Sequence, residues 1–193
     1  MNADALLKVT KALRVRLEQV AGAGKVFVGP LDDPDAAGAS LILFLYRIMP
    51  NASLRNFEHR VPSDVPPPPV VAFNNSLPLD LYYLITVGTT PGDSEEALLE
   101  TLGGAMQALQ LDPELTGPGV GYETVHVSLE PLTTDETSRI WALFPMANYR
   151  TSIAYIASPV WIDPKLPASV GSPVVIDSLK VGSRVGLIPE GSS

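Results

Sequence analysis

The sequence contains no cysteine and only two histidines, His59 and His126, among its 193 residues. Without cysteine there can be no disulfide and no thiolate metal site, and the composition fits a reducing compartment. The two histidines stand far apart, and neither has a metal-ligand spacing to the other. We therefore expect a surface or cross-strand position for both histidines.

Long apolar runs and an excess of positive charge are also missing. No segment approaches the roughly 18 apolar residues of a membrane-spanning helix, and charged residues interrupt residues 6–20, where a signal peptide would be apolar. The 13 Lys and Arg against 21 Asp and Glu give a formal net charge of −8. An acidic surface repels phosphate backbones and anionic lipids, so we expect neither nucleic-acid binding nor direct membrane insertion.

Catalytic and cofactor motifs are absent as well. Gly22–Lys25 lacks the first glycine and the Ser or Thr of a phosphate-binding loop and follows a predicted helix, so it predicts a helix end. Gly117–Gly121 departs from the dinucleotide fingerprint, and the acidic loop 31–40 is followed by Phe44 where a calcium loop needs a glutamate. No serine nucleophile elbow is present. We therefore expect no catalytic residue, cofactor or metal ligand.

The apolar content, by contrast, is high. Hydrophobic residues make up 46% of the chain and charged residues only 18%. This surplus over a typical soluble monomer favours a buried interface between subunits. The composition therefore predicts an oligomer.

Helical periodicity opens the chain. Apolar residues recur at spacings of three and four between Leu6 and Val20, which predicts an amphipathic helix over Met1–Val20. A capping box at Asp93–Glu96 predicts a second helix, with Gly103 and Gly104 indicating a close backbone contact. Its expected inner side comprises Leu98, Leu99, Leu102, Ala105, Met106 and Leu109. A second capping box at Thr133–Glu136 predicts a short helix that Pro145 ends.

Strand patterns fill most of the remaining chain. Continuous apolar residues at Leu41–Met49 predict a strand buried on both faces, whereas clean alternation at Leu79–Val87 predicts a half-buried strand. Pro159 marks an edge or a bulge within its strand. The other expected strands are Lys25–Val28, Ser53–Val61, Thr124–Leu129, Ser152–Ile162 and a final strand pair or extended arm over Val174–Ile188.

The order of these elements predicts the fold class. Runs of strands interrupted by few helices indicate an α+β fold, with a mostly antiparallel mixed sheet packed by two main helices. The chain length suits a single domain, which we place at residues 1–188. Four consecutive prolines at 66–69 predict a stiff proline-rich excursion over 62–78. Residues 189–193 are expected to form a flexible tail.

The same segments, in the same order, resemble a known family. They are LILFLYR at 41–47, LPLDLYYLIT at 77–86, MQALQ at 106–110, WALFP at 141–145, YRTSIAY at 149–155 and PVWI at 159–162. Together with the leading helix and the proline-rich stretch, this arrangement is similar to the Pvc16-like N-terminal domain. That family comprises the cap, or tail-terminator, proteins of extracellular-type contractile injection systems.

The resemblance implies a structural role and a tail-terminator-like fold. It implies a hexameric ring on the last layer of the inner tube, in contact with the last layer of the sheath. The ring would end the polymerisation of tube and sheath and couple the two, with no cofactor and no catalysis. Its implied partners are further copies of the chain, the inner tube protein and the sheath protein. Assembly is expected in the cytoplasm, within a particle whose release or anchoring the sequence leaves open.

Basic residues beside predicted strands, and one tryptophan, are candidate contacts with such partners. Charge beside a strand edge could meet an acidic neighbour, and large aromatic residues serve as interface anchors. The candidate interface residues are Arg47, Arg55, Arg60, Arg150, Trp161, Lys180 and Arg184. Two alternatives stay open: a non-catalytic assembly adaptor or chaperone that is absent from the finished particle, and a hydrolase with an unrecognised site.

Overall fold

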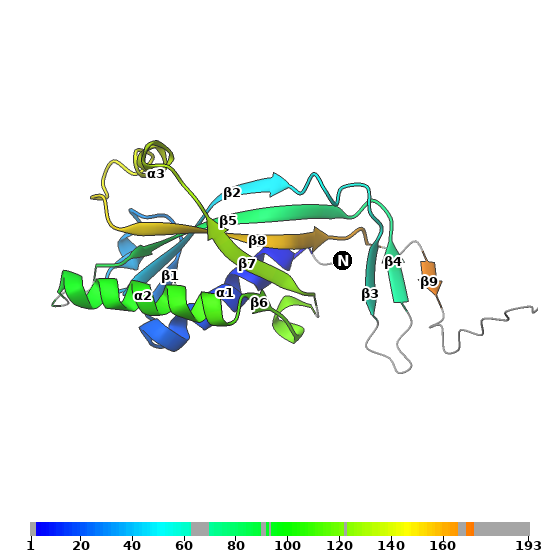
Figure 1. The fold of residues 1–193 in the computed structure, drawn as a ribbon, viewed down its shortest axis with the longest axis horizontal. Helices are drawn as coiled ribbons and strands as arrows, with labels where there is room; N and C mark the ends of the chain where they lie inside the picture. The colour runs from blue at the N-terminus through cyan, green and yellow to red at the C-terminus, as the bar shows by residue number, and fades with distance from the viewer. Residues whose placement is uncertain are drawn as a thin grey trace, which may run out of the picture.

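The computed structural model of the chain describes residues 3–62, 70–89, 92, 94–121, 123–165 and 169–171. A six-stranded sheet forms the body (Figure 1), with the strand order β1-β2-β5-β8-β7-β6. Only β1 and β2 pair in parallel, and the other neighbours are antiparallel. The strands are β1 (Val26–Val28), β2 (Leu41–Pro50), β5 (Leu77–Val87), β6 (Glu114–Leu115), β7 (Val125–Glu130) and β8 (Ser152–Ile162). The predicted α+β class and mostly antiparallel sheet are confirmed.

Two long helices cover one face of this sheet (Figure 1): α1 (Ala5–Ala21) and α2 (Glu95–Leu111). Val9, Leu13 and Leu17 lie one helical turn apart and are buried, because a spacing of four places side chains on one helical face. Gly22 ends α1 with φ of 96°, a conformation that glycine adopts without steric strain. The first predicted helix is therefore confirmed from Ala5, and residues 1–2 lie outside the described part.

The opposite face is only partly covered. The short helix α3 (Thr134–Trp141) and the chain after it pack Trp141 and Phe144 against Ile42 and Leu84. The predicted capping box is confirmed: the Thr133 side chain accepts from the Glu136 amide, and the Glu136 side chain accepts from the Thr133 amide. This second core lies at one end of the molecule, and none of the described helices lies over the other end of this sheet face (Figure 1).

This uneven cover corrects two burial predictions. The strand β2 is fully buried only at Leu41–Leu43 and becomes exposed from Arg47 onward, so the prediction of burial on both faces was wrong for its second half. The strand β5 lies between β2 and β8, and both faces of Tyr83–Val87 are buried. The half-buried prediction therefore holds for Leu79–Tyr82, where burial alternates, and was wrong for Tyr83–Val87. Leu84 on the second face is covered by Trp141 and Phe144, which come from the distant α3 segment.

Pro159 lies inside the sheet, because β8 has β5 on one side and β7 on the other. The pairing Leu79↔Val160 is followed by Leu81↔Ala157, which leaves one extra residue on β8. This is a β-bulge, where the missing amide of a proline is tolerated. The bulge prediction is confirmed and the edge prediction is wrong.

A second, three-stranded antiparallel sheet lies at one end of the body (Figure 1), in the order β3-β4-β9. Its strands are β3 (His59–Pro62), β4 (Val70–Phe73) and β9 (Ser169–Gly171). Two predictions change here. The expected strand Ser53–Val61 begins only at His59, after a series of turns, and the expected connector 62–78 contains β4 and the start of β5. The four prolines and the expected strand pair over Val174–Ile188 lie outside the described residues.

The N-cap of α2 (Glu95–Leu111) is one residue later than the predicted cap, Asp93, which lies outside the described residues. Ser94 is the N-cap residue, and its side chain accepts from the Ala97 amide at 3.2 Å. Leu102, Ala105 and Leu109 are buried as predicted, but two residues of the expected inner side are substantially exposed, namely Leu99 and Met106. The buried stripe is narrower than predicted because α1 and the sheet cover only part of the helix.

None of the described helices is long and apolar enough to cross a membrane.

The glycine pair in α2 offers a matched test of helix packing. A Cβ on Gly104 would lie 2.7 Å from Val20 Cγ1, whereas a Cβ on Gly103 would meet nothing within 4 Å. We expect Gly103→Ala to raise the free energy of unfolding by about 1 kcal/mol, because alanine favours the helix. Gly104→Ala should lose this gain through its contact with Val20. Urea unfolding of both variants checks this, and equal stabilisation by the two would contradict the close packing of α1 and α2.

Candidate functional site

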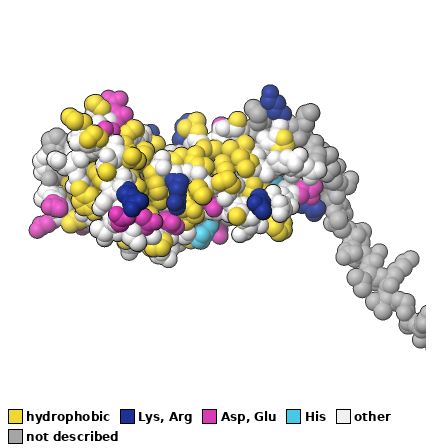
Figure 2. Space-filling model, turned by 90° about the horizontal axis from the view of Figure 1, so that it is seen from above, with side chains coloured by type: hydrophobic (Ala, Val, Ile, Leu, Met, Phe, Trp, Pro, Cys, Tyr) yellow, Lys and Arg dark blue, Asp and Glu magenta, His cyan; other side chains and the backbone are white. Residues whose placement is uncertain are grey.

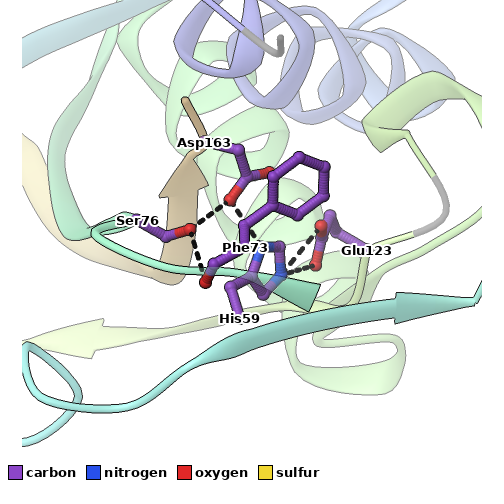
Figure 3. Close-up of polar contacts among 5 residues, drawn as sticks. All are labelled: His59, Phe73, Ser76, Glu123 and Asp163. Carbon is purple, nitrogen blue, oxygen red and sulfur yellow. Dashed lines mark hydrogen bonds and ion pairs between the residues drawn. The ribbon is translucent and has the colours of Figure 1, made fainter. Parts of the chain in front are cut away.

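Five residues from separate segments meet where the small sheet joins the body (Figure 3). His59 is the first residue of β3, Phe73 the last of β4, and Ser76 lies in the turn before β5. Glu123 precedes β7, and Asp163 directly follows β8. We call this set the His59 cluster.

Hydrogen bonds join both ring nitrogens of His59 to carboxylates. His59 Nδ1 lies 2.7 Å from Asp163 Oδ1, and His59 Nε2 lies 3.1 and 3.2 Å from the two Glu123 oxygens. Ser76 Oγ donates to Asp163 Oδ1 at 2.7 Å. His59 and Asp163 are only 5% and 7% exposed. Because carboxylates only accept, the imidazole satisfies both of them when each of its nitrogens carries a proton.

Aromatic rings enclose the imidazole. The Trp161 ring of β8 stacks on His59 with ring centroids 4.4 Å apart and an interplanar angle of 9°. Phe73 lies near the ring at 6.4 Å and 29°. A cation over an aromatic face is attracted by the ring electrons, so these contacts also favour the charged form of His59.

The contacts within the cluster raise the pKa of His59 and lower the pKa of Asp163. Burial alone would lower the pKa of His59, but its hydrogen bonds to Asp163 and Glu123 outweigh burial and raise the pKa to about 9. Burial would raise the pKa of Asp163, but hydrogen bonds from His59 and Ser76 outweigh it, so this pKa is lowered. The cluster at neutral pH is therefore an imidazolium between two carboxylates.

A catalytic triad and a metal site fit this geometry less well than a buried ion pair does. In a Ser-His-Asp triad the hydroxyl contacts the histidine, but here Ser76 binds the carboxylate of Asp163, so His59 is not placed to activate Ser76. The ligand atoms of His59, Glu123 and Asp163 do lie within 4.8 Å of one another. A metal ion, however, would bind one ring nitrogen and leave the other to a hydrogen bond. A carboxylate on each nitrogen suits a proton better than a metal ion.

The buried position of His59 corrects the sequence prediction for this residue. His126 is exposed on β7 as expected, but the prediction of a surface or cross-strand position for His59 was wrong. Its partners stand 64 and 104 residues away in the sequence. No local pattern signals such a convergence.

Two of the predicted interface arginines lie away from the His59 cluster. The Arg47 guanidinium lies 3.9 Å from the centre of the Tyr82 ring and 3.7 Å from a Glu130 carboxylate oxygen. Arg150 donates to the backbone carbonyls of Val87 and Leu31 at 3.2 and 3.3 Å, and burial lowers its pKa. Arg47 thus keeps a half-exposed charge, whereas Arg150 ties three segments of the chain together.

The other candidates fall into three groups. Arg55 and Arg60 are exposed, and Arg60 pairs with Glu58 at 2.8 Å. Trp161 is 8% exposed and lies against His59. Lys180 and Arg184 lie outside the described residues. Among the five described candidates, Trp161 contacts His59 and Arg60 is its neighbour on β3, and an interface role for any of the seven stays a prediction.

Surface features that the residue patterns did not indicate lie elsewhere. A groove of about 400 Å³ between α1 and the chain after β6 is lined by Lys8, Lys11 and Arg16. On the face that carries α3, hydrophobic side chains gather over the middle of the molecule, with charged side chains around them (Figure 2). Exposed large hydrophobic residues near α3 and the end of β2 include Ile48, Met49, Leu143, Met146 and Tyr149.

Comparison with known proteins places the fold. The family model described as the Pvc16 N-terminal domain matches residues 8–176. One similar solved structure is the PVC sheath/tube terminator of an extracellular contractile injection system in its extended state. It has a TM-score of 0.59 and 19% identity, over 97% of this chain and 66% of that chain. Another is the anti-feeding prophage cap, a tube-terminating cap, with a TM-score of 0.60 and 20% identity, over 90% of this chain and 60% of that chain.

These likenesses show a shared tail-terminator fold. The chain spans less than two thirds of the length of both structures. No curated protein matches the sequence.

Proposed function

The chain belongs to the Pvc16 N-terminal domain family, and from this membership we propose that it is a structural cap of a phage-tail-like contractile injection system. In this role it forms a hexameric ring that ends the polymerisation of tube and sheath and couples the two. The observation that carries the proposal is the fold shared with a sheath/tube terminator and a tube-terminating cap over at least 90% of this chain.

The surface is suited to the contacts that a ring requires. A ring of identical subunits joins two different patches of each subunit, and the rotation between subunits closes the ring. The exposed hydrophobic residues near α3 and the basic groove beside α1 are two such different patches. We assign the further contacts to the inner tube and sheath proteins, and we place assembly in the cytoplasm as part of the particle.

The proposed role involves no catalysis and no cofactor. Three of the five buried polar or charged side chains among the described residues belong to the His59 cluster, namely His59, Ser76 and Asp163, and the geometry of this cluster supports a structural role. Ser76 is bound to the carboxylate of Asp163, so it is not poised as a nucleophile beside His59. Incubation of the purified protein with general esterase, phosphatase and peptidase substrates should give no turnover above the buffer rate, and measurable turnover would favour a hydrolase.

Deletion of the chain tests the capping role directly. We expect particles lacking it to have irregular lengths, because nothing stops the addition of tube and sheath layers. Electron microscopy of particles from deletion and complemented strains measures the length distribution, and averaging of particle ends looks for a ring of six. Uniform lengths after deletion would contradict the proposal. Absence of the chain from purified particles by mass spectrometry would favour an assembly adaptor or chaperone.

Arg47 tests one candidate contact with an acidic partner. Its guanidinium is half exposed, so Arg47→Glu should leave the fold intact while it reverses the charge at this surface. We expect fewer capped particles by electron microscopy. The matched control is Arg139→Glu on α3, where the exposed arginine pairs with Asp135 at 2.9 Å. Equal capping by both variants and the unaltered protein would remove Arg47 from the interface.

A further inference from the structure

The small sheet is attached to the body without a shared strand ladder. Among the described residues, β3, β4 and β9 pair only with one another, and the six body strands pair only among themselves. Backbone hydrogen bonds between strands therefore do not set the angle between the two sheets. That angle depends on the turns that connect the two sheets (Figure 1) and on the side chains that meet between them.

One side chain of the small sheet contacts three parts of the body. His59 belongs to β3, and its ring touches Asp163 after β8, Glu123 before β7 and Trp161 within β8. Figure 3 shows the imidazole between the two carboxylates, which approach it from different segments. The arrangement uses all the polar groups of the ring and one of its faces.

We infer that the protonated side chain of His59 is a lock that holds the small sheet at a fixed orientation on the body, and that loss of its proton releases the small sheet. A neutral imidazole has one N–H and can donate to only one carboxylate. The other carboxylate would then face a ring nitrogen lone pair at about hydrogen-bond distance. A carboxylate that loses a charged donor and faces a lone pair instead is destabilised, although Asp163 keeps the Ser76 hydroxyl as a donor.

The charged groups around His59 explain why the attachment of the small sheet depends on the proton of its ring. Among the described residues, Asp163 and Glu123 are the charged groups that face the ring from the body, whereas β4 contributes Phe73 and β8 contributes Trp161. On its own strand, the neighbours Glu58 and Arg60 pair with each other at 2.8 Å, and the N-terminal ammonium acts on Asp163 from outside the ring. The imidazolium separates the two carboxylates, and removal of its proton leaves two like charges on either side of a neutral ring. The raised pKa of about 9 agrees with a lock that is closed at neutral pH.

Nuclear magnetic resonance can follow the lock directly, because the chain has only two histidines. The His126→Gln variant assigns the ring signals of His59. We expect the His59 signals to titrate with a midpoint about pH 9, and Glu123→Gln to move this midpoint to lower pH. A His59 midpoint at or below the ordinary value of about 6.5 would overturn the inference.

Hydrogen exchange then tests whether the proton holds the small sheet. After correction for the intrinsic pH dependence of exchange, the amides of β3 and β4 should exchange faster at pH 10 than at pH 7, relative to those of β5. At pH 7, His59→Gln should speed exchange in β3 and β4 by roughly 10- to 100-fold, the range for loss of a charged hydrogen bond. His126→Gln is the matched control and should leave this exchange unchanged.

Two outcomes of the exchange experiment would overturn the lock. One is that the small sheet of the unaltered protein is equally protected at pH 7 and pH 10, or that His59→Gln protects it as well as the unaltered protein does at pH 7. The other is protection at pH 10 that Zn²⁺ restores in the unaltered protein but not in His59→Gln, because the cluster would then be a metal site. Faster exchange of the small sheet at pH 10 that Zn²⁺ does not reverse supports a lock that depends on the proton of His59.

Discussion

Asp163→Asn is expected to lower the free energy of unfolding by about 3 kcal/mol or more at pH 6, the range for breaking a buried ion pair. The substitution keeps the size of the side chain but removes the charge that faces His59 Nδ1 at 2.7 Å. The asparagine amide oxygen can still accept from Ser76, so the expected loss comes from the missing charge. Because Asp163 is 7% exposed, water cannot replace that charge. Urea unfolding followed by circular dichroism measures the loss.

The control is an ion pair of similar type on the surface. Glu130→Gln removes the partner of Arg47, which lies 3.7 Å away and is half exposed. We expect a loss below about 0.5 kcal/mol, because exposed ion pairs contribute little. Losses of similar size in the two variants would mean that the His59 cluster is not a buried, tightly coupled unit.

The pH dependence of stability gives a second reading of the same substitution. The pKa of His59 is raised from 6.5 to about 9 in the folded chain, so its contribution is complete below about pH 6.5 and lost as pH rises through about 9. The pKa of Asp163 is lowered from 3.8, so its contribution is present above about pH 3.8 and lost at lower pH. Both contributions are complete between about pH 4 and 6.5.

Asp163→Asn should therefore be least stable relative to the unaltered protein inside that window. The difference between the two proteins should shrink as pH rises toward 9.5, where the unaltered protein has lost its imidazolium. Urea unfolding at pH 6 and pH 9.5 measures this difference, and comparison of the two proteins at each pH cancels the titration of other groups. A difference that stays constant across the range would contradict the coupling of Asp163 to a protonated His59.

Gly88→Ala is expected to lower the free energy of unfolding by about 3 kcal/mol, or to prevent folding. A Cβ at this position would lie 1.8 Å from the backbone oxygen of Ala39 and 2.6 Å from its carbonyl carbon. The Gly88 amide donates to the Ser40 carbonyl at 2.8 Å, so the two backbones cannot separate without loss of this bond. Overpacking against rigid backbone costs more than against a side chain that can rotate.

Gly103→Ala serves as the control for Gly88→Ala, because it makes the same chemical change where nothing lies within 4 Å of the new Cβ. Thermal and urea unfolding of the two variants compare them, and yield of folded protein is the readout if Gly88→Ala does not accumulate. A Gly88→Ala variant within about 1 kcal/mol of the unaltered protein would show that the segment before β2 can move away from β5.

Local patterns in the sequence determined most of the secondary structure. The spacing of Val9, Leu13 and Leu17 and the capping box at Thr133 and Glu136 are found in the structure as predicted. Alternation of side chains predicted β5, because the period of a strand is a property of neighbouring residues. The ordered segments from 41–47 to 159–162 were enough to place the chain in its family.

Burial and the His59 cluster were decided only by the tertiary structure. Whether β5 has one covered face or two depends on α3, which lies some distance along the chain. His59 meets Glu123 and Asp163 across 64 and 104 residues. The antiparallel pairing of β7 and β8 brings the start of β7 beside the end of β8, and the small sheet packs against the body there. Periodicity describes which side of its own element a residue faces. What that side meets is set by how distant elements pack, and this determines the charge, burial and role of a residue such as His59.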